Sequence, residues 1–239
     1  MESSPVVSLF IPCLVDQVYP EMGIAMTQVL RALGYCVEYD SRQSCCGQPA
    51  FNAGHWSEAK TVARHCLQIF QGKEIIVSPS GSCTAMVRKF YQQLFSGEPV
   101  SIPAIYEFSE FLCMRGDTAK ISGNFSGRVG FHYSCHSYRE LRLKQEPFEI
   151  LRKISGCELI ELPGEPICCG FGGLFSIKFP AIAGAMAEAR LNQFLEKNID
   201  TIVSNDPGCI MQLRQEVKER RLTLAILHLT EFLSKAMKL

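Results

Sequence analysis

Eight cysteines recur in two sets of the same form. Each set has a single Cys after an apolar run, then a Cys-Cys-Gly triplet, then a single Cys in a turn sequence. The first set is Cys13, Cys45, Cys46 and Cys83, and the second is Cys135, Cys168, Cys169 and Cys209. Thiolates are soft ligands that suit iron–sulfur clusters and zinc, so each set is a candidate four-thiolate metal site.

The total of twelve cysteines in 239 residues is high for a cytosolic protein. In a reducing compartment so many thiols seldom form a disulfide framework, and metal binding or redox chemistry is the usual explanation. We assign Cys66 and Cys113 to the core, because each lies in an apolar, helix-like stretch. Cys36 and Cys157 also recur, each upstream of one Cys-Cys-Gly triplet. Their apolar context favours core packing over ligation.

The residues around the two sets favour a bulky inorganic group. Gly47 and Gly170 follow the Cys-Cys pairs, where glycine permits positive φ and close backbone approach. The turn sequences SPSGS and SNDPG precede Cys83 and Cys209. Such turns direct backbone N–H groups at anionic sulfurs, which favours an iron–sulfur cluster.

Other chemistries explain less of the pattern. Structural zinc normally uses Cys-x-x-Cys knuckles, which neither set contains. A vicinal disulfide leaves the other repeated cysteines unexplained. A nucleophile formed by Cys135 and His136 has no counterpart in the first set, where Leu14 follows the Cys. The glycine-rich segment 168–176 matches no complete phosphate-binding fingerprint. The remaining histidines have no ligand spacing and are assigned to surface or core positions: His55, His65, His132 and His228.

The whole chain is predicted to be a duplication. Four pairs of similar segments occur in the same order at offsets between 121 and 126 residues: LFIPC with FHYSC, SCCGQPAF with ICCGFGGLF, EIIVSPSGSC with DTIVSNDPGC, and AIYEFSEFL with AILHLTEFL. Matches at nearly one offset indicate two copies of one unit. We expect a first half at 1–114, a linker rich in Gly, Ser, Asp and Asn at 115–127, and a second half at 128–239.

Each half alternates short β-rich runs with helical periodicity. The first half has expected strands at 6–11, 37–39 and 75–78 and expected helices at 20–33, 58–70 and 84–95. The second has strands at 129–133, 159–162 and 201–203 and helices at 148–154, 181–196 and 210–220. Ser57 is the expected N-cap of the helix at 58–70. The predicted fold is α/β, with two pseudo-equivalent halves that each form a small parallel βαβ sheet flanked by helices.

This topology explains how cysteines far apart in sequence could meet. In an open parallel sheet, the loops after the carboxyl ends of the strands lie together on one edge. Each of the eight repeated cysteines follows a predicted strand. We therefore expect four thiols to gather at one edge of each sheet.

The composition is that of an ordinary globular protein. Hydrophobic residues make up 47% and charged residues 20%, and 24 basic residues balance 24 acidic ones. There is no basic field to favour nucleic acid as a partner. The apolar run at 6–14 is too short for a bilayer span and contains Pro12, so no transmembrane segment is expected. Without an export signal, the expected location is the cytoplasm.

On these motifs the chain resembles the cysteine-rich CCG domain, in which a Cys, a Cys-Cys-Gly and a Cys-x-x-Cys follow at gaps of roughly thirty to forty residues. The gaps here are 31 and 36 residues in the first half and 32 and 39 in the second. Tandem copies occur in the cysteine-rich subunit of heterodisulfide reductase and in the iron–sulfur subunits of glycolate oxidase and anaerobic glycerol-3-phosphate dehydrogenase. The loops CCGQPAFNAG and CCGFGGLFS, in a chain this short, most resemble the lactate-utilisation protein A family.

That resemblance implies an iron–sulfur electron-transfer subunit of an L-lactate oxidation complex. It implies two iron–sulfur clusters of the 4Fe–4S type, with the eight repeated cysteines as ligands. Its partners would be companion lactate-utilisation iron–sulfur and accessory proteins, and peripheral association with a membrane electron acceptor is compatible with it. No residue set looks able to take a hydride or proton from lactate unaided, so catalysis would lie in a partner or in the assembled complex.

One departure from the family pattern concerns the last Cys of Cys-x-x-Cys, which is replaced by Met86 and Gln212. The related heterodisulfide reductase protein holds noncubane clusters with five Cys ligands, so this loss argues against disulfide-cleaving chemistry. Two alternatives stay open: a heterodisulfide-reductase-type thiol/disulfide oxidoreductase, and a non-redox metal-binding assembly module.

Overall fold

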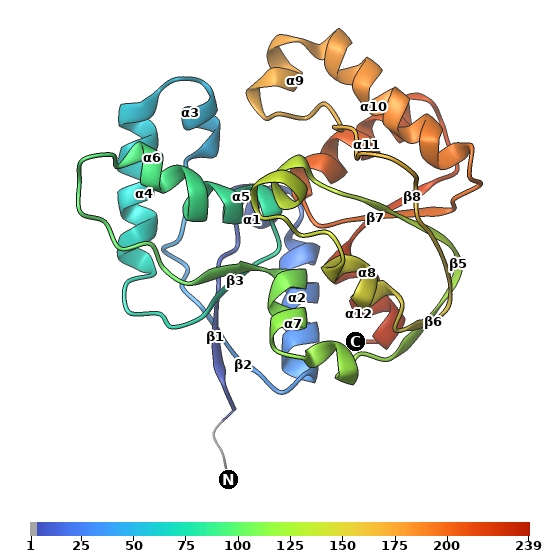
Figure 1. The fold of residues 1–239 in the computed structure, drawn as a ribbon, viewed down its shortest axis with the longest axis horizontal. Helices are drawn as coiled ribbons and strands as arrows, with labels where there is room; N and C mark the ends of the chain where they lie inside the picture. The colour runs from blue at the N-terminus through green and yellow to red at the C-terminus, as the bar shows by residue number, and fades with distance from the viewer. Residues whose placement is uncertain (1–3) are drawn as a thin grey trace.

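The computed structural model describes residues 4–239, so the first three residues of the expected first half lie outside it. Two four-stranded parallel sheets with the same strand order form its framework (Figure 1). The first sheet runs β2 (Cys36–Tyr39), β1 (Val6–Leu9), β3 (Ile76–Ser78) and β4 (Ile105–Glu107). The second runs β6 (Ile154–Ile160), β5 (Gly123–His132), β7 (Thr201–Ser204) and β8 (Ala225–His228). This arrangement confirms the predicted α/β fold with two equivalent halves.

Helices flank both sheets. Those of the first half are α1 (Cys13–Val18), α2 (Pro20–Ala32), α3 (Gln48–Asn52), α4 (Trp56–Ile69), α5 (Gly81–Ala85), α6 (Tyr91–Leu94) and α7 (Phe108–Met114). Those of the second half are α8 (Glu146–Leu151), α9 (Leu174–Lys178), α10 (Pro180–Leu195), α11 (Pro207–Glu219) and α12 (Leu229–Met237). A short 3-10 turn lies at Asp117–Lys120, and π-helical turns lie at Met86–Phe90 and His136–Glu140. Among residues 4–239 we find no helical segment with the length and hydrophobicity that a bilayer span requires.

Several local predictions were wrong. The halves each have a fourth strand, β4 and β8, which was not predicted because three or four apolar residues run directly into a helix there. Strand β5 begins at Gly123, inside the segment expected as a linker. Its Gly- and Asn-rich start resembles a turn but forms a bulged strand, with a register shift between Asn124 and Gly127.

Three helix predictions also need correction. Ser57 is not an N-cap, because α4 begins one residue earlier and the Ser57 hydroxyl hydrogen-bonds the neighbouring Glu58 carboxylate. The helix expected at 84–95 contains the π-helical turn Met86–Phe90, which sequence periodicity does not distinguish from an α-helix. The helix expected at 148–154 ends at Leu151, because Ile154 already starts β6.

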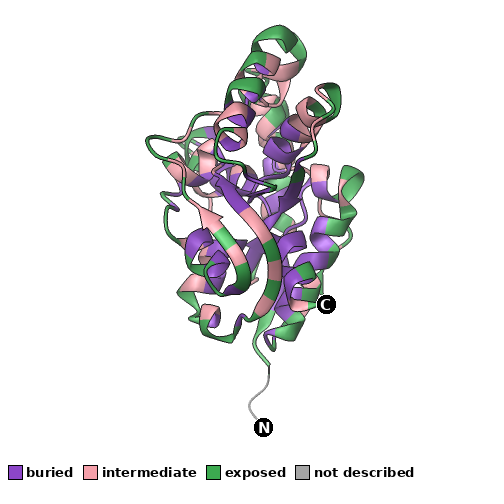
Figure 2. Cartoon of the chain, turned by 90° about the vertical axis from the view of Figure 1, so that its right-hand side faces the viewer, coloured by how far each residue is buried: buried purple, intermediate pink, exposed green. Residues whose placement is uncertain are grey.

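The largest hydrophobic core is shared by the two halves. Helices α2, α7, α8 and α12 lie between the two sheets in Figure 1, and their apolar residues join those of both sheets in a single cluster. The buried residues concentrate on the inward faces of the helices and on the strands other than the edge strands β2 and β6, which are largely half-buried or exposed (Figure 2). A second cluster fills the space between the other face of the first sheet and helices α4 to α6. The division of the chain at 115–127 stays a prediction.

The last helix of each half begins with an equivalent cap. Glu107 caps α7 and His228 caps α12, and each completes a capping box with the Glu three residues later. The His228 ring also reaches the other half, where its Nε2 lies 2.7 Å from the Pro79 carbonyl oxygen. Thr230 donates to the Met22 carbonyl at 2.9 Å. These contacts fix the second half against the first.

Replacing Glu107 with Gln is expected to stabilise the protein at pH 8. Burial raises the pKa of Glu107 to about 8, above its value in the unfolded chain. Because the folded state then retains a proton that the unfolded state has lost, stability falls as the pH rises through the window between about 4.5 and about 8. Gln keeps the cap without this titration, and since one pKa unit corresponds to about 1.4 kcal/mol, the gain at pH 8 should be up to about 4 kcal/mol. Urea unfolding at pH 5 and pH 8 measures it.

The exposed Glu196→Gln variant is the matched control and should leave the pH dependence unchanged. An equal pH dependence in wild type and Glu107→Gln would contradict the assignment of this titration to Glu107.

Candidate metal centres

Each repeated cysteine lies near the carboxyl edge of its sheet. Cys13 begins α1, just after β1, and Cys83 lies in α5, just after β3. Cys45 and Cys46 occupy the loop between β2 and α3. In the second half, Cys135 precedes the π-helical turn, Cys168 and Cys169 lie between β6 and α9, and Cys209 lies in the first turn of α11. The strand topology therefore carries all eight side chains to one end of the two sheets.

The four thiols of each set touch one another. In the first half the Sγ atoms of Cys13 and Cys45 lie 3.7 Å apart, and those of Cys46 and Cys83 lie 3.3 Å apart. The thiol of Cys45 is also a hydrogen-bond partner of Cys46, which links the two pairs. We call this group, Cys13, Cys45, Cys46 and Cys83, the first site.

The second half repeats the arrangement. The Sγ atoms of Cys169 and Cys209 lie 3.2 Å apart. Cys168 is a hydrogen-bond partner of both Cys135 and Cys169. We call Cys135, Cys168, Cys169 and Cys209 the second site. Sequence reasoning thus predicted the gathering of both quartets, while metal ligation by them stays a proposal.

The Cys-Cys-Gly loops hold one sulfur of each site as a hydrogen-bond acceptor. The N–H of Gly47 points at the Cys45 sulfur at 3.4 Å, and that of Gly170 at the Cys168 sulfur at 3.3 Å. Both glycines have positive φ, of 83° and 85°. This left-handed conformation favours glycine, and it directs the N–H group back to the sulfur two residues earlier.

These hydrogen bonds favour one thiolate in each site. The pKa of Cys45 is lowered by the thiols of Cys13 and Cys46 and by the Gly47 N–H. The pKa of Cys168 is lowered in the same way by Cys135, Cys169 and the Gly170 N–H. The pKa values of Cys46 and Cys169 are raised, because each donates to neighbouring sulfurs and is buried. The thiolate form is therefore favoured at Cys45 and Cys168, whereas Cys46 and Cys169 would lose their protons when a metal binds.

Both sites open into a single cavity of about 250 Å³. All eight repeated cysteines line it, together with residues from both halves that include Gln48, His136, Phe171 and Asp206. The Gln48 and His136 side chains are in contact across it, with 3.2 Å between their Nε2 atoms. Asp206 accepts a hydrogen bond from the backbone N–H of Ser82 at 2.7 Å, which ties the two cysteine loops together.

One of the histidines assigned to surface or core positions, His132, lies in the core beside the second site. A ring nitrogen of His132, the last residue of β5, lies within 4.8 Å of the Cys169 and Cys209 sulfurs. His132 is fully buried, and its Nδ1 accepts a hydrogen bond of 3.0 Å from Arg190 Nε. The alignment of the two halves contained a signal for this site residue, because a polar His132 stands where the first half has the apolar Phe10.

The other cysteines lie apart from both sites. Cys66 is buried, as predicted, while Cys113 and Cys157 are half-buried. Cys36 is exposed, so its assignment to the core was wrong. The apolar run around Cys36 belongs to β2, an edge strand, where one face of the strand meets solvent.

The two residues that replace a fifth cysteine do not line the described cavity. Met86 is fully buried in the core of the first half. Gln212 donates to the Ala183 carbonyl at 3.2 Å. Neither supplies a further sulfur ligand to the cavity.

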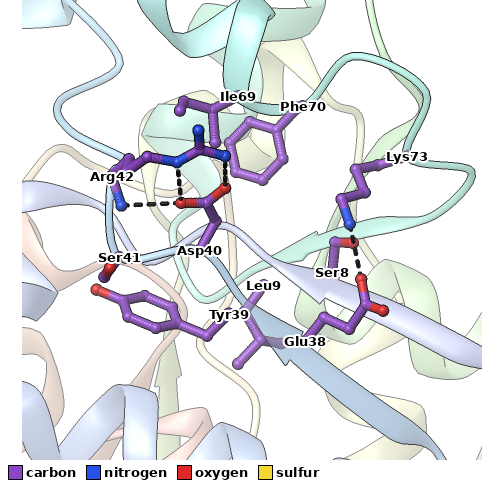
Figure 3. Close-up of a pocket in the computed structure, with 10 residues that line it drawn as sticks. All are labelled: Ser8, Leu9, Glu38, Tyr39, Asp40, Ser41, Arg42, Ile69, Phe70 and Lys73. Carbon is purple, nitrogen blue, oxygen red and sulfur yellow. Dashed lines mark hydrogen bonds and ion pairs between the residues drawn. The ribbon is translucent and has the colours of Figure 1, made fainter.

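A second hollow, of about 500 Å³, lies at the carboxyl end of edge strand β2 (Figure 3). Asp40 is paired with Arg42 at 2.6 Å, and Glu38 with Lys73 at 2.8 Å. Within each pair the acidic and the basic side chain neutralise one another. The hollow contains none of the repeated cysteines.

Gly170→Ala is expected to destabilise the protein more than Gly47→Ala. A Cβ at Gly170 would lie 2.5 Å from the Ala183 carbonyl oxygen, whereas one at Gly47 would lie 3.1 Å from the Ala59 carbonyl oxygen. Strain from positive φ applies to both, so the backbone clash should add about 1–3 kcal/mol at Gly170. Urea unfolding of the metal-free variants measures the difference.

Gly164→Ala isolates the effect of φ, because Gly164 has φ of 81° and open space around its Cβ position. A loss for Gly170→Ala no larger than that of Gly164→Ala would contradict the predicted close approach.

Comparison with known proteins agrees with this duplicated architecture. The model of the CCG family, a cysteine-rich domain, matches the chain twice, at residues 7–88 and 129–214. The fold and the paired cysteine sites thus define a tandem CCG cysteine-rich protein.

Curated relatives match nearly the whole chain. Lactate utilization protein A of Halalkalibacterium halodurans is 37% identical, over 95% of this chain and 96% of the relative. The protein of the same name from Geobacillus kaustophilus is 34% identical, over 95% and 98%. Lactate utilization protein A 2 of Bacillus cereus strain Q1 is 32% identical, over 97% and 98%. The chain belongs to the lactate utilization protein A family.

Among solved structures, glutamate racemase RacE1 of Bacillus anthracis aligns with 98% of this chain and 80% of its own, at a TM-score of 0.42 and 12% identity.

Proposed function

We propose that the chain is an iron–sulfur electron-transfer subunit of an L-lactate oxidation system. Two 4Fe–4S clusters would be held by the eight repeated cysteines, one cluster in each site. The observation that carries this proposal is the convergence of two complete four-thiol sets on one cavity. Iron–sulfur clusters bound in this way supply one-electron redox chemistry.

The donor sets fit such a group. Each site offers four sulfurs, and the carboxylate of Asp206 in the shared cavity already accepts hydrogen bonds from the Ser82 and Gly208 N–H groups. Sulfur ligands are those that iron–sulfur clusters select. Backbone N–H groups already point at Cys45 and Cys168, and hydrogen bonds of this kind stabilise anionic sulfur. Beside the second site, the buried Arg190 has no carboxylate partner within residues 4–239, which favours an anionic group there.

The protein's own residues would position the two groups and exclude water. Cys46, Cys83, Cys169 and Cys209 are buried, while Cys13, Cys45, Cys135 and Cys168 are half-buried. Each site therefore has an inner pair of sulfurs in the core and an outer pair toward the cavity. The shared cavity brings the two sites close together, which favours electron transfer between them.

The involvement in lactate use rests on the relatives, whose printed name is Lactate utilization protein A. We propose that the chain acts in the cytoplasm with companion lactate-utilisation proteins, one of which supplies the residues that oxidise the substrate. Peripheral contact with a membrane electron acceptor is compatible with this role.

A gene-replacement experiment tests the function. A strain that lacks the gene should lose growth on L-lactate but retain growth on glucose, and the wild-type gene should restore it. The Cys45→Ser/Cys168→Ser gene should not restore growth, whereas the Cys36→Ser/Cys157→Ser gene should. Full growth on L-lactate with the first double variant would contradict the proposal.

A specific observation favours a second candidate, structural zinc. Four thiolates around one tetrahedral zinc, with bonds of about 2.3 Å, lie about 3.8 Å apart. The Sγ separations within the two sites, 3.2 to 3.7 Å, approach that value. Binding of one zinc per site, with no redox signal, would make the chain a non-redox assembly module.

A further inference from the structure

The two sites have different surroundings, and His132 is one source of the difference. Arg190 can only donate hydrogen bonds, so the His132 Nδ1 that faces it at 3.0 Å must be an acceptor. The neutral imidazole therefore carries its hydrogen on Nε2. This Nε2 is buried and has no hydrogen-bond partner among the described residues. The sulfurs of Cys169 and Cys209 lie within 4.8 Å of the ring nitrogen nearest them.

This protonation pattern favours His132 as a donor and not as a metal ligand. A ligand would have to bind through the lone pair of Nε2. The neutral ring would then carry its hydrogen on Nδ1, where the Arg190 N–H already points. With its hydrogen on Nε2, the ring satisfies the Arg190 contact and leaves an unpartnered N–H available to an anionic group in the second site.

Arg190 adds a positive charge beside the same site. Its side chain is 3% exposed and contacts His132, the Gln193 carboxamide and the face of the Phe194 ring. It forms no ion pair within residues 4–239. Burial lowers the pKa of Arg190 to about 10, so the guanidinium stays charged at neutral pH. A buried, unpaired cation is costly, and an anionic group in the second site would offset that cost.

The first site lacks both groups. Phe10 occupies the position of His132 in the repeat. The carbonyls of Ala59 and Ala183 approach the two loop glycines in the same way. Cys66 follows Ala59 by seven residues in α4, and Arg190 follows Ala183 by seven residues in α10. The first half therefore has a neutral thiol at the position where the second half has a cation. At the two positions that hold His132 and Arg190 in the second half, the first site therefore has apolar or uncharged side chains.

We propose that His132 and Arg190 give the iron–sulfur group of the second site a higher reduction potential than that of the first site, so that electrons pass from the first site to the second. This inference rests on the proposed function. Reduction adds one negative charge to the group, and a nearby cation and N–H donor stabilise that charge. In the transfer the first site loses one electron, the second gains it, and no bond or proton changes place.

Redox titration followed by EPR tests the inference on anaerobically purified protein. Wild type should show two potentials. The His132→Phe/Arg190→Leu variant, which gives the second site apolar side chains at these two positions, should lower only the higher potential. The reduction equilibrium of that site should fall by about tenfold or more, equivalent to about 59 mV for one electron. Iron content should remain that of wild type.

Two further variants keep the test decisive if the double variant folds poorly. His132→Gln preserves an acceptor for Arg190 and a donor for sulfur, and should retain the wild-type gap. His132→Phe alone keeps the cation and should give a smaller shift in the same direction. Arg214→Leu, which removes a guanidinium bound to the Ile226 carbonyl, is the control and should leave both potentials unchanged.

The outcomes separate the inference from the function. Iron bound at both sites, with potentials unaffected by every His132 and Arg190 substitution, would overturn the inference and leave the proposed function standing. A shift of the lower potential instead of the higher would also overturn it. Wild-type protein that binds no iron after anaerobic reconstitution would overturn both.

Discussion

Cys46→Ser is expected to remove the metal group of the first site and leave that of the second, so that iron falls from about eight to about four per chain. Cys46 is almost fully buried, and its sulfur lies 3.3 Å from that of Cys83. A serine hydroxyl there is a harder and far less acidic donor than a thiol, and no other described cysteine side chain lines the cavity in its place. Cys169→Ser should have the mirror effect on the second site. Iron and sulfide analysis after anaerobic purification measures both.

The control is Cys36→Ser, which replaces an exposed cysteine outside both sites and should leave the iron content at the wild-type value. Retention of full iron by both Cys46→Ser and Cys169→Ser would refute the ligand assignment. Loss of all iron from either single variant would show that the two sites do not load independently.

Gly81→Ala is expected to weaken the contact between the two halves and lower metal binding at both sites. A Cβ at Gly81 would lie 1.8 Å from Ser137 Oγ and 3.1 Å from Ser137 Cβ, across the boundary between the halves. Rotation of Ser137 would break its hydrogen bonds with Ser134, at 2.8 Å, and with Asn205, at 3.0 Å. Overpacking of this kind costs about 1–3 kcal/mol. Because Cys83 and Cys135 flank the contact, both cysteine loops should shift.

Urea unfolding of the metal-free protein and iron content of the loaded protein measure these effects. The compensating variant Gly81→Ala/Ser137→Gly provides space for the new methyl group and should recover most of the stability. A single Gly81→Ala variant as stable and as fully loaded as wild type would show that the halves separate more readily at this contact than the structure indicates.

Much of the candidate site could be predicted from the sequence, because one physical rule governs it. The carboxyl ends of parallel strands share one edge, so cysteines placed after successive strands had to approach one another. The repeat of the Cys-Cys-Gly loops predicted that Gly47 and Gly170 would take the same backbone conformation, and both have positive φ. These features depend on local sequence and on topology alone.

Other features depend on packing between the halves, which no local pattern reports. The return of α12 onto α2 is fixed by contacts such as that of Thr230 with the Met22 carbonyl, which joins residues at opposite ends of the chain. His132 seemed an ordinary core residue, since its neighbours in sequence are apolar. Its place beside Cys169 and Arg190 arises only when α10 packs on β5. The exposure of Cys36 likewise follows from the edge position of β2.

The most direct test of the account is the iron and acid-labile sulfide content of anaerobically purified, reconstituted protein, with EPR of the dithionite-reduced form. Two four-iron sites predict about eight irons and about eight sulfides per chain, together with the EPR signals of two reduced clusters. Two zinc ions per chain without sulfide, or no bound metal under these conditions, would contradict the electron-transfer function and favour an assembly module.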